Sequence, residues 1–357
     1  MKISKEITSH RPVSHGGLFS IKKPNPKIID FSSNISPIGP PPLVKKYLKK
    51  HLDDLEIYPD SNSTLMRKNL QWYTKIPYSQ IVAGNGATEI IYNFCQAFLS
   101  KKTRVLIPIP TFGEYEAAAK LRGSKISYFN TMNLNNDVEG FIRKIPKNGC
   151  VFLCNPNNPT GVLISKKNIK KIIESAAKKS TLVFVDECFI ELVPKRNESV
   201  SKLVKKFDNL FVLRSLTKSF GLAGIRIGYG LGPKSLITTL NKIKIPWNVS
   251  GLAQKAADAA ICHSFYLDKA KKVIEKESKF LRKEISNIKE FQCHNSNTNF
   301  ILIKTKSKSK VIQKKLLKKN ILVRDCSSFK GIGNNYIRIK VKTRNEKKKL
   351  IQAMKKI

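Results

Sequence analysis

Lys218 is the residue whose surroundings give this sequence its clearest potential for chemistry. It lies in the segment LRSLTKSFG, residues 213–221, and Arg226 follows shortly afterwards. A lysine amine can form a Schiff base with a carbonyl compound. Ser215 and Thr217 offer hydroxyl donors, and Arg226 offers a planar fork that suits a phosphate dianion. In a chain this rich in lysine, a basic turn between two strands is the alternative interpretation.

Asp186 is a second candidate, because it ends the apolar segment Val183–Val185. This pattern is typical of a buried strand that delivers a carboxylate at its C-terminal end. A carboxylate beside a pyridine nitrogen keeps that nitrogen protonated, and pyridoxal phosphate joins such a pyridine to an aldehyde and a phosphate. Lys218 and Asp186 together therefore predict a pyridoxal phosphate enzyme, although a lone aspartate is more often a helix cap or an ion-pair partner.

Three further segments complete the predicted cofactor site. The segment GNGAT, residues 84–88, follows an apolar strand and opens a helix, whose N-terminal N–H groups suit a phosphate. Asn158, in NPNNPTG, could donate to the ring oxygen of the cofactor, and Phe112 could stack on its ring. Each segment alone is weak evidence, whereas the ordered set is strong. The predicted cofactor-binding residues are Gly86, Ala87, Thr88, Phe112, Asn158, Asp186, Ser215, Thr217, Lys218 and Arg226.

The elements that must position these residues can be predicted from the hydrophobic pattern. Between residues 43 and 245, short apolar strands alternate with lysine-rich amphipathic helices. This alternation predicts an α/β domain with a mostly parallel sheet, covered on both faces, and a site at the carboxyl ends of its strands. A long helical stretch is expected over residues 254–288. The apolar segments 299–303 and 336–341 predict a small α+β domain, so we expect an arm at 1–42, a large domain at 43–245 and a small domain at 246–357.

Composition agrees with an enzyme of the cytoplasm. The 357 residues are 41% hydrophobic, enough for a large core divided into two lobes. No apolar run is long enough to span a membrane, and the N-terminus lacks the apolar stretch of a signal peptide. The seven cysteines form no Cys-x-x-Cys pair, and the five histidines show no ligand spacing, so we expect no metal site.

The net charge of +42, from 67 Lys and Arg against 25 Asp and Glu, raises the possibility of nucleic-acid binding. The lysines, however, are spread over nearly every expected helix, and no nucleic-acid motif is present. We therefore expect no specific nucleic-acid partner and attribute the charge to a compositional bias. A positive field of this size also favours salt-sensitive adhesion and the capture of an anionic substrate.

From about Phe31 to Arg344, the chain resembles the class I/II aminotransferase superfamily of fold-type I pyridoxal phosphate enzymes. Within it, the motifs are more similar to threonine-phosphate decarboxylases of cobalamin biosynthesis than to histidinol-phosphate aminotransferases. The similar segments are HGG at 15–17, DFSSNISP at 30–37, LRSLTK at 213–218, PWNVS at 246–250 and VRDCSSF at 323–329. Aminotransferases of this superfamily usually carry a tyrosine three residues after the ring aspartate; here the position is Phe189, which cannot donate a hydrogen bond.

The resemblance implies an activity and a set of substrate contacts. The implied reaction is the decarboxylation of L-threonine O-3-phosphate to (R)-1-amino-2-propanol O-2-phosphate and CO₂, for the nucleotide loop of cobalamin. The alternative is a histidinol-phosphate aminotransferase or a related aminotransferase. The implied substrate-binding residues are His15, Gly16, Asn34, Asn158, Arg324 and Arg338, although a single strand-edge arginine is more often merely solvated. Tyr58 matches a tyrosine that reaches the cofactor phosphate of the neighbouring subunit, which implies a homodimer with shared active sites.

Overall fold

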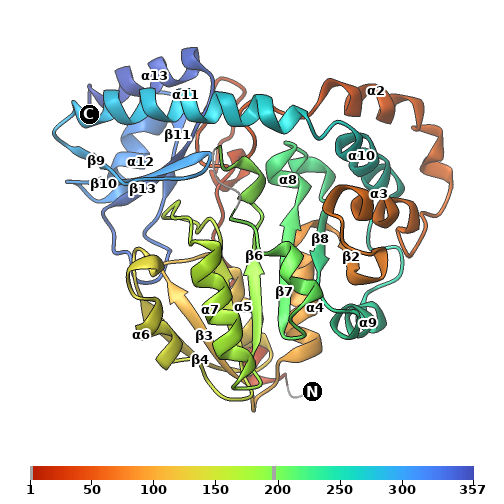
Figure 1. Ribbon diagram of the computed structural model, residues 1–357. Coiled ribbons are helices and arrows are strands. Elements are labelled where there is room, and N and C mark those ends of the chain that lie inside the picture. Colours follow the sequence, from red (N-terminus) through yellow and green to blue (C-terminus); the bar gives the residue numbers. More distant parts are fainter. Residues whose placement is uncertain (1–2, 195–197) are drawn as a thin grey trace.

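The centre of the molecule is a mixed, mostly parallel sheet of seven strands. The computed structural model describes residues 3–194 and 198–357 (Figure 1). The strand order is β2-β8-β7-β6-β5-β3-β4, and β8 runs antiparallel to both of its neighbours. The bounds are β2 (Ile81–Gly84), β3 (Arg104–Ile109), β4 (Lys125–Asn130), β5 (Cys150–Cys154), β6 (Leu182–Asp186), β7 (Leu210–Ser215) and β8 (Gly228–Leu231). The predicted α/β class is thus confirmed.

Alternation along each strand divides the core of this sheet into two faces. In β6, Val183 and Val185 pack in one hydrophobic cluster, whereas Phe184 packs in the other. Because successive side chains point to opposite faces, Asp186 lies on the same face as Phe184. That face is covered by α4 (Gly86–Phe98), α5 (Glu114–Leu121) and α9 (Lys234–Ile243). The other face is covered by α3 (Thr64–Thr74), α6 (Val138–Arg143), α7 (Lys166–Ala177) and α10 (Gly251–Cys262).

A smaller lobe follows in the chain and has its own sheet and core. Its strand order is β12-β13-β10-β9, with all neighbours antiparallel. The elements are β9 (Phe291–Cys293), β10 (Phe300–Thr305), α12 (Ser309–Leu317), β12 (Arg324–Asp325), β13 (Tyr336–Lys340) and α13 (Arg344–Met354). The long helical stretch expected over 254–288 consists of two helices, α10 and α11 (Tyr266–Ser286), and α11 runs from the large core to the small one (Figure 1).

The N-terminal arm links the two lobes. After α1 (Lys5–Thr8), the arm runs through β1 (Ile29–Asp30), which pairs in parallel with β11 (Ile321–Leu322) of the small lobe. The backbone N–H of Ser36 then donates to the carbonyl oxygen of Lys218 over 2.9 Å, and α2 (Pro42–Lys50) follows. The arm is therefore fixed between the small lobe and the lysine segment.

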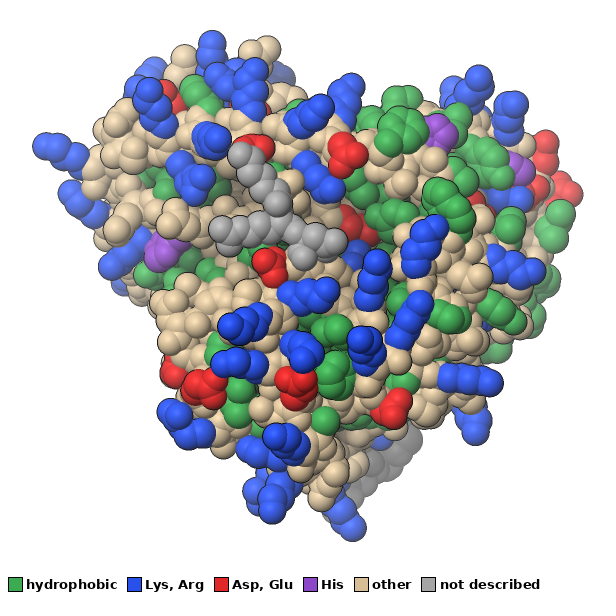
Figure 2. Space-filling view, viewed as in Figure 1, with side chains coloured by type: hydrophobic (Ala, Val, Ile, Leu, Met, Phe, Trp, Pro, Cys, Tyr) green, Lys and Arg blue, Asp and Glu red, His purple; other side chains and the backbone are tan. Residues whose placement is uncertain are grey.

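Charged side chains cover the visible surface broadly. Figure 2 shows Lys and Arg over all of this face, without a single basic stripe. No helix among residues 3–194 and 198–357 has the length and apolar character needed to cross a bilayer.

Candidate active site

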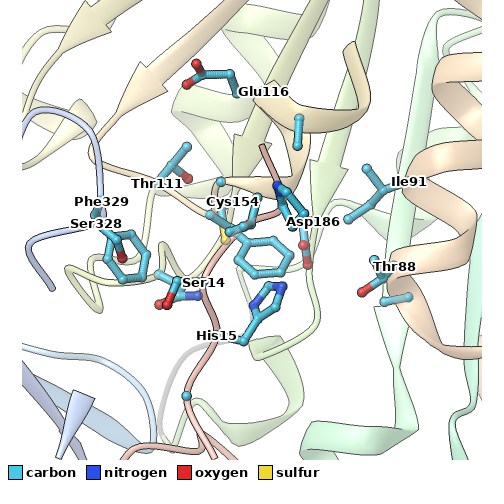
Figure 3. Close-up of a pocket in the computed structure, with 18 of the residues that line it drawn as sticks. Ser14, His15, Thr88, Ile91, Thr111, Glu116, Cys154, Asp186, Ser328 and Phe329 are labelled. Atoms are coloured by element: carbon cyan, nitrogen blue, oxygen red, sulfur yellow. The ribbon is translucent and has the colours of Figure 1, made fainter. Parts of the chain in front are cut away.

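A cavity of about 1140 Å³ lies at the carboxyl ends of β5, β6 and β7. Its walls come from distant segments, as Figure 3 shows for Ser14 and His15 of the arm, Thr88 of α4, and Ser328 of the small lobe. It brings together most of the residues predicted from the sequence. Those that line it are His15, Gly16, Asn34, Ala87, Thr88, Phe112, Asn158, Asp186, Ser215, Thr217, Lys218, Arg226, Arg324 and Arg338.

Lys218 lies on α8 (Leu216–Ser219), directly after β7. Burial lowers the pKa of its ammonium, and the nearby guanidinium groups of Arg338 and Arg226 lower it further, whereas Asp186 acts in the opposite direction. These effects favour the neutral amine, which is the form that attacks a carbonyl carbon. The environment of Lys218 therefore suits a nucleophilic lysine.

Asp186 ends β6 inside the cavity and is 5% exposed. Its Oδ2 accepts a hydrogen bond from the hydroxyl of Tyr115 over 2.6 Å, and its Oδ1 accepts from the backbone N–H of Cys188 over 2.8 Å. Burial raises the pKa of the carboxyl, and these two hydrogen bonds oppose the rise. A carboxylate in such a buried position calls for a positively charged partner.

Tyr115 was not predicted as part of the site. It is fully buried on α5, and its ring stacks on Phe152 of β5 with the centroids 5.3 Å apart. Tyr115 thereby fixes the Asp186 carboxylate from the aromatic core beneath the cavity. A tyrosine three residues after Phe112 gives no signal in the sequence that its hydroxyl meets the end of β6.

The N-terminus of α4 and Arg226 form a cradle suited to a phosphate. Gly86 begins the helix with a φ of +80°, and a Cβ at this position would lie 2.6 Å from the Arg226 guanidinium. Only glycine allows this approach at low cost. Gly86 itself does not line the cavity, but it brings Arg226 against the first turn of α4, next to Ala87 and Thr88. N–H groups at a helix start together with a guanidinium are the donors that a phosphate requires.

Arg338, on β13, is a buried cation that contacts neutral oxygens. Its guanidinium donates to the side-chain oxygen of Asn158 and, over 2.8 Å, to the carbonyl oxygen of Ser32. Its centre also lies 5.4 Å above the ring of Phe300, and burial lowers the pKa of Arg338 to about 10. Its Nε has no hydrogen-bond partner among the described residues.

Arg324, on β12, is held in a similar way. It donates over 2.6 Å to the carbonyl oxygen of Ser14 and over 2.9 Å to the hydroxyl of Ser328. Within the described parts of the chain, neither arginine forms an ion pair with a carboxylate. A cavity with two such uncompensated cations suits a ligand with two anionic groups.

Asn34 gives independent evidence that the cavity binds a ligand. It is 3% exposed and lines the cavity, yet neither its side-chain oxygen nor its nitrogen has a partner in the described residues. Buried amides are nearly always hydrogen-bonded, so a polar group of a bound ligand would supply the partners that these two atoms lack. The orphaned amide, the phosphate cradle, the nucleophilic lysine and the buried aspartate fit pyridoxal phosphate with an anionic substrate.

Tyr58, like Gly86, is a predicted site residue that does not line the cavity. It is 80% exposed, and its ring contacts that of Trp247 with the centroids 5.1 Å apart. Phe189 does line the cavity, where it packs edge-on against Phe300 at 5.1 Å.

The fold and the cavity together define a pyridoxal phosphate-dependent enzyme of fold type I. The sequence profile described as aminotransferase class I and II matches residues 26–354, and the chain belongs to this family. It is 37% identical to a Caldanaerobacter subterraneus protein provisionally named threonine-phosphate decarboxylase, covering 98% of this chain and 95% of that one. It is 34% identical to histidinol-phosphate aminotransferase of Methanococcus aeolicus, covering 93% and 90%.

A solved structure is also similar over nearly its full length. The histidinol-phosphate aminotransferase of Clostridium acetobutylicum superposes with a TM-score of 0.85 at 30% identity, covering 92% of this chain and 98% of that one. The predicted family and the predicted cofactor, pyridoxal phosphate, are thus confirmed.

Proposed function

We propose that this enzyme decarboxylates L-threonine O-3-phosphate to (R)-1-amino-2-propanol O-2-phosphate and CO₂, a step in building the nucleotide loop of cobalamin. The observation that carries the proposal is Phe189. It occupies, inside the cavity, the position where aminotransferases of the superfamily usually have a tyrosine, and it offers no hydroxyl. The alternative is a histidinol-phosphate aminotransferase, the name that the Methanococcus aeolicus relative carries.

The charges of the cavity support a substrate with two anionic groups. Threonine phosphate has a carboxylate and a phosphate, and Arg324 and Arg338 are two buried cations without carboxylate partners in the described residues. We propose that these arginines, with His15, Gly16 and Asn34, bind the two groups. Amino donors of aminotransferases can also be dianionic, so this feature supports both candidates and Phe189 favours the decarboxylase.

Each residue has a separate task in the proposed reaction. When bound, pyridoxal phosphate withdraws electrons from the α-carbon of an amine substrate. With the cofactor bound, Lys218 would hold it in the resting enzyme and, as an ammonium group, would donate the proton that the α-carbon needs once CO₂ has left. The Asp186 carboxylate would stabilise the protonated ring nitrogen. The arginines would hold the carboxylate of the substrate in the orientation in which its bond to the α-carbon breaks.

Phe189→Tyr tests the discriminating position. The new hydroxyl should donate to the ring oxygen and draw away part of its negative charge, so that the neighbouring Lys218 nitrogen holds its proton less tightly. The absorbance of the bound cofactor should then titrate at a lower pH, and decarboxylation should fall. A pH titration of the absorbance of both proteins measures the first effect. If the two curves superimpose, Phe189 serves packing against Phe300 alone and the argument against an aminotransferase loses its basis.

A direct assay separates the two candidate reactions. The pure holoenzyme is incubated with threonine phosphate and, separately, with histidinol phosphate and 2-oxoglutarate, and CO₂ and glutamate are measured. The proposal requires CO₂ from the first mixture and no glutamate from the second. Glutamate formation without CO₂ would identify an aminotransferase.

We also propose that the enzyme is a homodimer with shared active sites. Large apolar side chains are exposed in the segment after α2 and around Trp247, and Figure 2 shows apolar side chains gathered over α2, α3 and α10. The exposed residues of this region include Leu52, Leu55, Ile57, Tyr58, Ile245 and Trp247. An apolar surface of this kind is typical of an interface between subunits. Sedimentation analysis should give twice the chain mass of 40.4 kDa.

A further inference from the structure

The arm segment Ser14–Gly17, which we call the arm turn, is fastened to three other parts of the chain. Ser14 is held by Arg324 of the small lobe, and the backbone N–H of Gly17 donates to the hydroxyl of Ser32 over 2.8 Å. Gly16 lies so close to Ser32 that a Cβ would be 2.8 Å from its carbonyl oxygen. The backbone on both sides of His15 is therefore fixed, while its side chain lines the cavity and is about half exposed.

Glu114 makes the third attachment, through the His15 side chain itself. One carboxylate oxygen of Glu114 lies 2.6 Å from Nε2 of His15, and the other accepts a hydrogen bond from the Tyr92 hydroxyl over 2.7 Å. Glu114 is only 5% exposed. Burial acts to raise the pKa of its carboxyl, but the hydrogen bonds from His15 and Tyr92 outweigh that effect and lower the pKa. The charged carboxylate therefore has one residue on the arm and one on α4 as hydrogen-bond partners.

This contact determines how the imidazole can meet a ligand. A carboxylate only accepts hydrogen bonds, so Nε2 of His15 must carry the proton. Nδ1 remains for another partner, and in the doubly protonated ring it donates to an anion. The ring also lies beside that of Phe112, with the centroids 5.8 Å apart. A ring held in this way presents Nδ1 to a ligand in a fixed orientation at low entropic cost.

We propose that Glu114 is a positioning residue that fixes His15 toward the cavity, so that the arm turn recognises the phosphate group of the substrate. This inference rests on the proposed function, because it assumes a phosphorylated substrate. The proposal gives a role to Glu114, a buried acid that is part of neither the phosphate cradle nor the pair of substrate-binding arginines.

The test measures binding to the holoenzyme without turnover. The probes are 3-phosphonooxybutanoate and 3-hydroxybutanoate, which have the threonine skeleton but no amine and so cannot react at Lys218. Calorimetry gives both dissociation constants for the wild type, Glu114→Gln, His15→Ala and the double variant. The matched control is Glu116→Gln, which removes the same charge from the same helix. Glu116 contacts Lys120 and Lys330 instead of the arm.

The expected results differ in sign between the two glutamates. Loss of a negative charge near the cavity should by itself strengthen the binding of an anion, so Glu116→Gln should leave affinity for the phosphorylated probe equal or higher. Glu114→Gln should instead weaken it by about tenfold, the size of one charge-assisted hydrogen bond, and leave 3-hydroxybutanoate unaffected. In the His15→Ala background, Glu114→Gln should cause no further loss, because residues that act through one another are not additive.

Two results would overturn the inference. If Glu114→Gln weakens both probes equally, or still weakens the phosphorylated probe without His15, Glu114 has a general structural role. If the wild type binds both probes with the same affinity, the proposed substrate class is itself wrong. The last result is distinct, since it appears in the wild type before any substitution is made.

Discussion

Lys218→Ala should fold normally and lose turnover by at least about 10⁴-fold, because the group that holds the cofactor and moves the proton is gone. Stability should not fall, since a lysine whose pKa is lowered by burial is costly to bury in its charged form. Borohydride reduction of the wild-type holoenzyme, followed by peptide mapping, should place the pyridoxyl label on Lys218. The variant should take up no label at this peptide.

The control for this experiment is a lysine outside the site. Lys242→Ala changes an exposed lysine on α9 and should keep both the label and the activity. Thermal unfolding followed by circular dichroism should give similar midpoints for all three proteins. A label on a different lysine of the wild type would refute the assignment.

Asp186→Asn should reduce turnover by about 10²-fold or more while the cofactor still binds. The amide cannot neutralise a protonated ring nitrogen, so the cofactor withdraws electrons less strongly. The phosphate cradle of α4 and Arg226 is unchanged, which is why binding persists. Steady-state kinetics and the absorbance of the bound cofactor measure the two effects separately.

Asp258→Asn is the matched control for Asp186. Asp258 is also a buried aspartate, but it lies on α10 and accepts a hydrogen bond from Asn69 over 2.7 Å. Its substitution should affect stability more than turnover. Turnover near the wild-type level in Asp186→Asn would mean that another group supports the ring nitrogen.

The sequence predicted best those residues whose surroundings follow from local pattern. Asp186 ends an apolar strand, and Lys218 follows another, so the topology of a parallel sheet brings them to the same edge. Tyr115 and Glu114 were not predicted, because their partners Asp186 and His15 lie far away in the chain. Such contacts depend on how α5 packs against the sheet and the arm, and no periodicity encodes that.

Two elements of the fold also differed from their local signals. β8 is rich in glycine, which disfavours a strand. A Cβ at Gly230 would lie only 2.2 Å from the ring of Phe211, so the glycine makes room for that ring. The break between α10 and α11 falls at residues 263–265, where no glycine or proline marks it. Tertiary packing decides both features. The boundary between the large and small domains at residue 245 remains a prediction. α10, which follows that boundary in the chain, packs with the core of the large sheet.

The pairing of β1 with β11 has a consequence for how the protein is made. Ile29 and Ile321 are separated by most of the chain, and Ser32 meets Arg338 still later. A ribosome releases residues in order, at about 5–20 per second, so the arm emerges first but must wait for its partners. The seven-stranded sheet has all its strands by Leu231. The active site is thus completed only after Arg338 has been made, and a nascent chain that stops before Ile321 carries Lys218 without the small-lobe wall of the cavity.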